Sequence, residues 1–433
     1  MKTIGPLFTR CITSDLLRDV RRSAFALVRK QAVVHCFHQI DDPYGALLLP
    51  LLAQLASQYQ VRFQLHCVPP PQDAATPDRV RLNAWALRDA EQLRLRLNLS
   101  PSTPLTPPMV ALKQKGLSAL VSAFKKGANL SALAAISTAV WCGDEASIDS
   151  LPKACAADVD QGLRAGEGMR NRLKGYLPSS MWFEGEWYWG VDRLPYLLRR
   201  LQSQGLGKGA DASFNWAVPD VVMVQSGALP LLKTKAVLTF YGSLRSPYTA
   251  LCIERLRYLV QRYQLELKIR PLLPMVMRGL KVPFKKRMYI LMDAKREAQR
   301  LGLDFGTVAD PVGLPAERGL AVWHAAIEKG VGLEFAESFL QGVFAQGIDA
   351  GSDAGLDLIA KRSGLDAPTV AAALANEGWR QCVAENRDAL LEAGLWGVPA
   401  FQVEGFAAQW GQDRLWVIEE QLRTLCVEKH EAL

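Results

Sequence analysis

The chain has 433 residues and a formal net charge of +8, with 49% apolar and 22% charged residues. This composition is typical of a globular protein, and the length allows two domains that each have a core. The basic residues are dispersed, and no apolar run reaches the roughly 18–20 residues of a membrane span. We therefore expect neither nucleic acid nor a membrane as a partner.

The eight cysteines are scattered and form no Cys-x-x-Cys motif. Because the N-terminus also lacks the apolar segment and cleavage site of a secretory signal, we expect reduced thiols and a cytoplasmic protein. Two segments, 35–38 and 66–67, contain histidine and cysteine, which are metal-ligating residue types. Adjacent residues of a strand point to opposite faces, so few of these side chains can converge and we predict no metal site.

The first elements predict a strand, a helix and a parallel strand. Residues 11–30 have helical spacing and are expected to form a helix in an N-terminal extension. Residues 32–37 read as a buried strand, Pro43 begins a helix that runs to about residue 59, and 61–68 returns as a strand. Two strands joined by a helix are parallel neighbours in most folds.

The same order returns 204 residues later, and the letters also match. The matches are Ala32/Ala236, Pro43-Tyr44/Pro247-Tyr248, Leu52/Leu256, Tyr59-Gln60/Tyr263-Gln264 and Asp89-Ala90/Asp293-Ala294. Near the end of each half, Pro178 and Pro399 both lie eleven residues before a Trp-Gly-x-Asp-Arg-Leu segment, here at a shift of 221. We therefore predict an internal duplication, in which each copy adds a helical insertion and a hairpin that follows the proline.

Ser246 stands where the apolar strand of the second copy gives way to a helix. Serine at the N-cap followed by Pro247 at the first helical position is a strong helix-start signal. The unpaired N–H groups of a helix N-terminus favour an anion, so the Ser246 hydroxyl is well placed to stabilise a thiolate or a phosphate. Simple capping of the helix is the alternative reading.

Both copies resemble the thioredoxin-fold family that contains the disulfide oxidoreductase DsbA. The closer resemblance is to its glutathione-using branch, the kappa-class glutathione transferases and 2-hydroxychromene-2-carboxylate isomerases. The motifs are Ser246-Pro247-Tyr248-Thr249, Lys286-x-x-Tyr289-x-x-x-Asp293, Gly397-Val398-Pro399 and Gly411-Gln412-Asp413-Arg414-Leu415. The resemblance implies an α/β protein of two tandem thioredoxin-like domains, each with a helical insertion. Its parts are an N-terminal helical extension (1–30), a degenerate domain (31–203), a connector (204–235) and a second domain (236–433).

The resemblance also implies glutathione as a cosubstrate of the second domain. Ser246 matches the serine that activates the glutathione sulfur, and Pro399 matches a cis-proline. Val398 would present its backbone N–H and C=O to the cysteinyl unit. Asp413 would hold the γ-glutamyl ammonium with Gln412 beside it, and Pro247 and Tyr248 complete the binding set. A hydroxyl donor at a helix N-terminus can lower a thiol pKa toward neutrality, and the thiolate is the nucleophile.

The sequence departs from the family pattern in two places. Leu280 stands where the family usually has an asparagine that contacts glutathione, and Lys281, Lys285 or Lys286 could hold a carboxylate instead. In the first copy the motif reads Asp42-Pro43-Tyr44-Gly45, and the negative charge of Asp42 would oppose a thiolate. We therefore expect the first copy to be silent in this chemistry.

The predicted function is that of a glutathione-dependent isomerase or transferase acting on an electrophilic small molecule that is aromatic or conjugated. Its pocket is expected between the Ser246 loop and the helical insertion, lined by Tyr248, Tyr289 and Trp323. One alternative is a non-catalytic tandem thioredoxin-fold scaffold. Another is a thiol-disulfide oxidoreductase without Cys-x-x-Cys, working through Cys252. The sequence is compatible with an oligomer.

Overall fold

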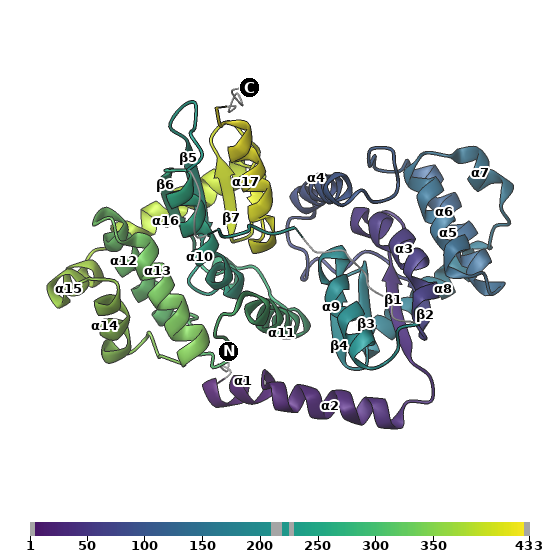
Figure 1. The fold of residues 1–433 in the computed structure, drawn as a ribbon, viewed down its shortest axis with the longest axis horizontal. Coiled ribbons are helices and arrows are strands. Elements are labelled where there is room, and N and C mark those ends of the chain that lie inside the picture. Colours follow the sequence, from purple (N-terminus) through teal and green to yellow (C-terminus); the bar gives the residue numbers. More distant parts are fainter. Residues whose placement is uncertain (1–4, 209–218, 225–228, 428–433) are drawn as a thin grey trace, which may run out of the picture. The chain divides into compact units, whose positions relative to one another are not determined.

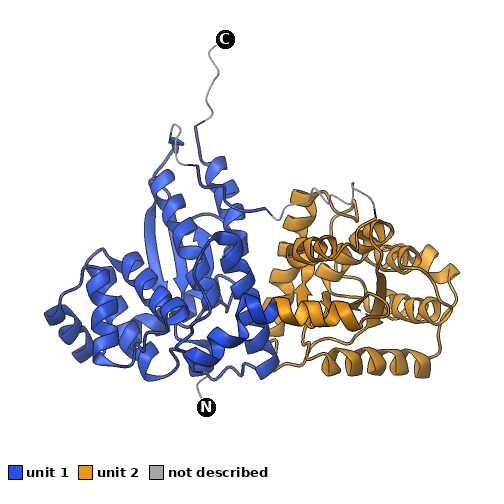
Figure 2. Cartoon of the chain, turned by 60° about the horizontal axis from the view of Figure 1, so that its bottom comes forward, with its two compact units in different colours: residues 1–18, 219–433 blue, residues 19–218 orange. Residues whose placement is uncertain are grey.

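The computed structural model describes residues 5–208, 219–224 and 229–427 (Figure 1). The chain divides into two compact units: unit 1 comprises residues 1–18 and 219–433, and unit 2 comprises residues 19–218 (Figure 2). Residues 5–18 therefore pack with the second half of the chain. Within the described ranges, no helix combines the length and apolar character needed to span a membrane.

Unit 2 is a four-stranded sheet with helices, in the strand order β2-β1-β3-β4. Its elements are β1 (Val33–His38), α3 (Pro43–Leu55), η1 (Ala56–Gln58), β2 (Arg62–Cys67), α4 (Arg79–Leu97), α5 (Val110–Lys125), α6 (Leu130–Trp141), α7 (Glu145–Ser150), α8 (Ala156–Arg172), β3 (Ser180–Phe183), β4 (Glu186–Trp189) and α9 (Gly190–Ser203). Strand β1 pairs in parallel with β2 and antiparallel with β3. Along the sequence, the helical insertion α4–α8 lies between the parallel pair and the hairpin β3–β4.

Unit 1 repeats this plan with the strand order β6-β5-β7-β8. Its elements from the second half of the chain are β5 (Val237–Gly242), α10 (Pro247–Arg262), β6 (Glu266–Pro271), η2 (Met275–Arg278), α11 (Phe284–Leu301), α12 (Leu314–Glu328), α13 (Gly332–Gln341), the π-helix η3 (Gly342–Gln346), α14 (Asp353–Arg362), α15 (Ala367–Ala375), α16 (Gly378–Glu392), β7 (Ala400–Val403), β8 (Gln409–Trp410), η4 (Gln412–Arg414) and α17 (Leu415–Thr424). The core of this unit joins β5, α10 and the insertion through fully buried side chains such as Phe240, Leu256 and Trp323.

The registers of the two sheets correspond, with one correction to the sequence comparison. Val33 faces Arg62 as Val237 faces Glu266, which is the shift of 204 in both strands. Ser180 faces Phe37, whereas Ala400 faces Tyr241, so the hairpin strand follows at a shift of 220. Ser179, and not Pro178, is therefore the structural counterpart of Pro399. The shift becomes 221 only after the turn, because Ala400 pairs with Trp410 ten residues on, but Ser180 with Trp189 nine residues on.

The N-terminal extension forms two helices and not the single helix that its spacing predicts. Helix α1 (Pro6–Ile12) and helix α2 (Asp15–Val28) are separated at Thr13 and Ser14. The Thr13 hydroxyl donates to the carbonyl of Thr9 at 2.8 Å, a local bond that competes with helix continuation. The second part of α2 packs in unit 2, where Arg22 forms a bidentate ion pair with Glu186 at 2.7 and 2.9 Å.

Candidate functional site

Ser246 caps α10 and faces the segment that precedes β7. Its Oγ accepts a hydrogen bond from the backbone N–H of Thr249 at 3.2 Å. The same Oγ lies 3.5 Å from the carbonyl oxygen of Val398, as the donor. The Val398–Pro399 peptide bond is cis. Two motifs 152 residues apart in sequence thus meet at the N-terminus of α10, as the resemblance implies.

An aromatic and basic cluster adjoins Val398. The indole rings of Trp396 and Trp410 pack edge to face, with their centroids 4.9 Å apart. The residue between Trp396 and Val398 is a glycine because a Cβ there would lie 2.2 Å from Trp410. Arg278 donates to the Trp396 carbonyl at 3.1 Å, and the ammonium of Lys286 lies 5.7 Å from the Trp396 ring centroid.

The pKa values of Arg278 and Lys286 are lower than those of ordinary surface arginines and lysines. Burial, together with the nearby Arg387, lowers the pKa of Arg278 to about 10. Burial lowers the pKa of Lys286 to about 8. Burial beside Trp396 thus disfavours the charged form of both groups, and an anion bound there would offset this cost. Leu280, which stands in the place of the usual asparagine, is half-buried in the loop between η2 and α11.

The two predicted γ-glutamyl contacts, Gln412 and Asp413, have different surroundings. Gln412 is 1% exposed; its Oε1 accepts from Arg255, and its Nε2 donates to Glu297 at 2.9 Å. The structure therefore gives the Gln412 amide two internal partners. Asp413 keeps 19% of its side chain exposed, with the guanidinium of Arg414 at 3.6 Å. Of this predicted pair, Asp413 is the residue whose carboxylate solvent reaches.

The three residues predicted to line the pocket differ in burial. Tyr248 lies in the first turn of α10 and donates to Asp293 at 2.8 Å, and Tyr289 is half-buried on α11. Trp323 is fully buried and donates to the carbonyl of Gly332 at 2.8 Å. The prediction that Trp323 lines a pocket is wrong, because this side chain fills the core between the sheet and the insertion.

Comparison with known proteins identifies the fold of this unit. The model of the DsbA-like thioredoxin domain matches residues 237–423. These residues form a DsbA-like thioredoxin domain. A search of curated protein sequences gave no match. Residues 237–423 are called the DsbA-like domain below.

A comparison with solved structures finds, among others, three similar proteins. A 2-hydroxychromene-2-carboxylate isomerase is 22% identical and is matched over 44% of this chain and 95% of its own (TM-score 0.38). A putative protein disulfide isomerase from Nitrosomonas europaea is 19% identical over 44% and 99% (TM-score 0.35). The cytosolic disulfide reductase DsbM from Pseudomonas aeruginosa, solved with GSH, is 18% identical over 43% and 99% (TM-score 0.35).

Cys252 of the DsbA-like domain lies one turn inside α10. It is fully buried, and its Sγ donates to the carbonyl of Thr249 at 3.1 Å. Burial raises the pKa of this thiol to about 12, so it stays protonated at neutral pH. A thiol-disulfide reaction through Cys252 would need both exposure and a thiolate, and this environment supplies neither.

In unit 2 a direct side-chain bond occupies the place of the Ser246–Val398 contact. The Ser179 hydroxyl donates to Asp42, which stands at the N-cap of α3. Among the described residues the cis peptide bonds are Ser100–Pro101 and Val398–Pro399, so the bond before Pro178 is trans. Burial raises the pKa of Asp42 to about 6. The pair fills this position with a carboxyl group, which disfavours a bound thiolate.

Replacing Asp42 with asparagine should stabilise unit 2 more at neutral pH than in acid. The folded pKa of about 6 lies above the ordinary value of 3.8, so ionisation of Asp42 destabilises the fold as the pH rises through 6. Asparagine still accepts from Ser179 without a charge. We expect a gain of about 2–3 kcal/mol in the free energy of unfolding at pH 7.5. The measurement is urea unfolding at pH 7.5 and pH 4.5; an equal gain at both would contradict this reading.

The histidine and cysteine side chains of β1 and β2 do not gather on one face of the sheet. His35 and His66 hydrogen bond through Nδ1 and Nε2 at 2.9 Å, whereas Cys36 and Cys67 are buried on the other face of the sheet. Burial is the main cause that lowers the pKa of both histidines, in the case of His66 to about 4. Across the described residues, no group of three or more potential metal ligands occurs.

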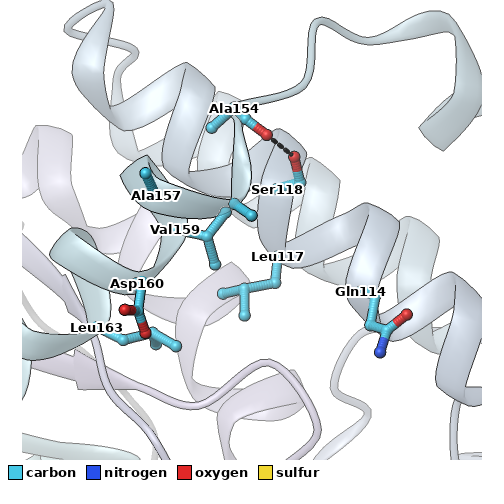
Figure 3. Close-up of a pocket in the computed structure, with 9 residues that line it drawn as sticks. Gln114, Leu117, Ser118, Ala154, Ala157, Val159, Asp160 and Leu163 are labelled. Atoms are coloured by element: carbon cyan, nitrogen blue, oxygen red, sulfur yellow. Dashed lines mark hydrogen bonds between the residues drawn. The ribbon is translucent and has the colours of Figure 1, made fainter.

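A pocket of about 610 Å³ lies in unit 2 between α5 and α8 (Figure 3). Its walls are small or apolar side chains, chiefly Leu117, Val159 and Leu163, and the Ser118 hydroxyl is bound to the carbonyl of Ala154 at 2.7 Å. Asp160 is its one ionisable lining residue. The lining residues of this pocket bring no acid–base pair together.

Proposed function

We propose that the DsbA-like domain binds glutathione and uses its thiolate to attack an electrophilic small molecule, as an isomerase or transferase. The observation that carries the proposal is the Ser246 hydroxyl at the N-terminus of α10, 3.5 Å from the carbonyl oxygen of Val398. An extended peptide can pair with the backbone of Val398 while its sulfur lies at the α10 N-terminus. There the hydroxyl and the helix dipole both favour the thiolate.

The remaining groups fit the two charged ends of glutathione. The exposed part of Asp413 would hold the γ-glutamyl ammonium, and Lys286 or Arg278 would hold the glycine carboxylate in place of the missing asparagine. Pro247 and Tyr248 form the floor beside the sulfur. The electrophile is an aromatic or conjugated molecule, and reduced glutathione is available in the cytoplasm, the compartment that the scattered cysteines favour.

The reaction is a nucleophilic addition. The thiolate sulfur uses an electron pair to form a bond to an electrophilic carbon. The π bond at that carbon breaks, and its electron pair passes into the conjugated system of the substrate. If the adduct is protonated, the product is a glutathione conjugate. If the carbon–sulfur bond breaks again after rotation about the neighbouring bond, the product is an isomer, and glutathione is regenerated.

We also propose that the two halves arose by tandem duplication. Equal strand orders and a common register shift support it. So does one repeated side-chain bond: Tyr44 donates to Asp89 and Tyr248 to Asp293, each at 2.8 Å and each at the shift of 204. The second copy retains Ser246, whereas the first has the Asp42–Ser179 pair. In this view only the DsbA-like domain is catalytic.

Glutathione should stabilise the protein against heat. Binding to the folded state adds RT ln(1 + [L]/Kd), about 2.7 kcal/mol at a hundredfold excess over Kd. Cysteinylglycine lacks the γ-glutamyl group, so it should stabilise less. Asp413→Asn should reduce the effect of glutathione and leave that of cysteinylglycine unchanged. The measurement is thermal unfolding with each thiol at millimolar concentration.

The rival function is a scaffold that keeps the fold without chemistry. Leu280 in the place of asparagine, and the internal partners of Gln412, favour this rival. Absence of stabilisation by glutathione in the thermal experiment would decide for the scaffold. Stabilisation that is unchanged in Asp413→Asn would keep binding but remove Asp413 from it.

A further inference from the structure

Two buried threonines, Thr9 in helix α1 and Thr13 at its C-terminal end, make polar contacts in unit 1. Leu7 and Phe8 are 81% and 54% exposed, whereas Thr9 and Thr13 are buried. The Thr9 Oγ1 accepts from the backbone N–H of Val308 at 2.9 Å. The Thr13 hydroxyl is 3.4 Å from a backbone carbonyl of the same loop. These two polar contacts are directed at the loop of residues 303–312, called here the α11–α12 loop.

The α11–α12 loop is built to receive α1. Gly306 has φ 131°, and a Cβ there would lie 2.4 Å from the Thr13 Oγ1, so only glycine permits this approach. On its other side, the loop pairs with the π-helix η3: Gly306 donates to the carbonyl of Phe344 at 2.9 Å, and Ala309 to that of Val343 at 2.8 Å. The loop is thus fixed between α1 and η3.

The same loop reaches the site through Asp310. Its carboxylate receives two hydrogen bonds from Arg245, at 2.6 and 2.7 Å, and the two side chains are 19% and 14% exposed. Such a two-point pair fixes orientation as well as distance. Arg245 immediately precedes Ser246. The corresponding residue of unit 2, Asp41, pairs with Lys113 of its own insertion at 3.0 Å, with the charges reversed.

We propose that α1 is a positioning element of the Ser246 site, acting through the α11–α12 loop and the Asp310–Arg245 pair. Its effect on thiol activation rests on the proposed function, whereas its effect on the loop does not. Helix α1 touches no reacting atom in this role. It holds the carbonyl and N–H groups of residues 306–308, so that Asp310 and Arg245 keep the Ser246 loop in one geometry.

The first test uses hydrogen exchange of the full chain without any thiol. Thr9→Val keeps the shape of the side chain and removes the acceptor for Val308. We expect amide exchange in peptides covering 304–310 and 243–249 to rise about fivefold or more. Thr9→Ser should restore the slow exchange, and Leu7→Ala, which changes an exposed residue of the same helix, should leave it unchanged. Faster exchange in 304–310 alone, or in neither peptide, would overturn the proposal.

The second test links the loop to the site. Asp310→Glu keeps the charge but moves the carboxylate. This variant and Thr9→Val should each raise the thiol pKa of bound glutathione, read from thiolate absorbance against pH, and the double variant should raise it no further than Asp310→Glu. Additive shifts would overturn the coupling. If the unchanged protein binds no glutathione, the proposed function fails, but the exchange experiment still decides the positioning role of α1.

Discussion

Ser246→Ala should raise the thiol pKa of bound glutathione by about one to two units. A hydrogen bond to a charged group contributes about 1.5–3 kcal/mol, which corresponds to this range. The variant should still bind glutathione, since Val398 and Asp413 are unchanged. The measurement is thiolate absorbance of the complex, titrated against pH in both proteins.

Two further variants separate activation of the thiol from capping of α10. Loss of the bond from Thr249 N–H to Ser246 should itself lower stability by about 1 kcal/mol. Ser246→Asp keeps a side chain that can accept the Thr249 N–H, but places a negative charge beside the sulfur. It should retain the stability and raise the thiol pKa further than alanine does. An unchanged thiol pKa in both variants would remove Ser246 from the mechanism.

Arg255→Leu should destabilise unit 1 by about 3–5 kcal/mol. Arg255 is 2% exposed and joins the connector to the site: it pairs with Asp220 at 2.5 Å and donates to Gln412. Removing one partner of a buried charged network leaves the others without compensation. Arg300 also pairs with Asp220, which limits the loss. The measurement is the free energy of unfolding from urea titration.

Arg257 on the same helix provides the matched control. It pairs with Glu337 at 2.6 Å, but the two side chains are 25% and 44% exposed. Exposed ion pairs contribute about 0–1 kcal/mol, so Arg257→Leu should have a small effect. Similar losses in both variants would show that burial of the Asp220–Arg255–Gln412 network adds nothing to unit 1.

Several features of the fold follow from the sequence alone. The order of strand, helix and strand in each half, and the shift of 204 between them, appear in the structure with the predicted partners. Ser246 caps α10 with Pro247 in the first turn, as the local pattern indicates. Such features are set by neighbouring residues, because strand alternation and helix caps depend on short stretches of chain.

Where the hairpin strand pairs was decided only by the tertiary structure. The sequence comparison aligns Pro178 with Pro399, but the pairing of β3 and β7 aligns Ser179 with Pro399. The reason is that the turn between β7 and β8 is one residue longer than the turn between β3 and β4. A one-residue insertion in a turn is invisible when flanking motifs match. Register is fixed by contacts with β1 or β5 that lie far away in the sequence.

The burial of individual side chains and their long-range partners could likewise not be predicted from the sequence. Gln412 and Trp323 are residue types that suit a binding site, but packing encloses both. Ser246 meets Val398 across 152 residues, and α1 docks some three hundred residues from its own position, beside the loop that holds Arg245. The sequence alone indicated that Ser246 caps a helix beside a candidate anion site. Only the folded chain decided what faces that hydroxyl, because the contact depends on segments brought together by the core and not by local preference.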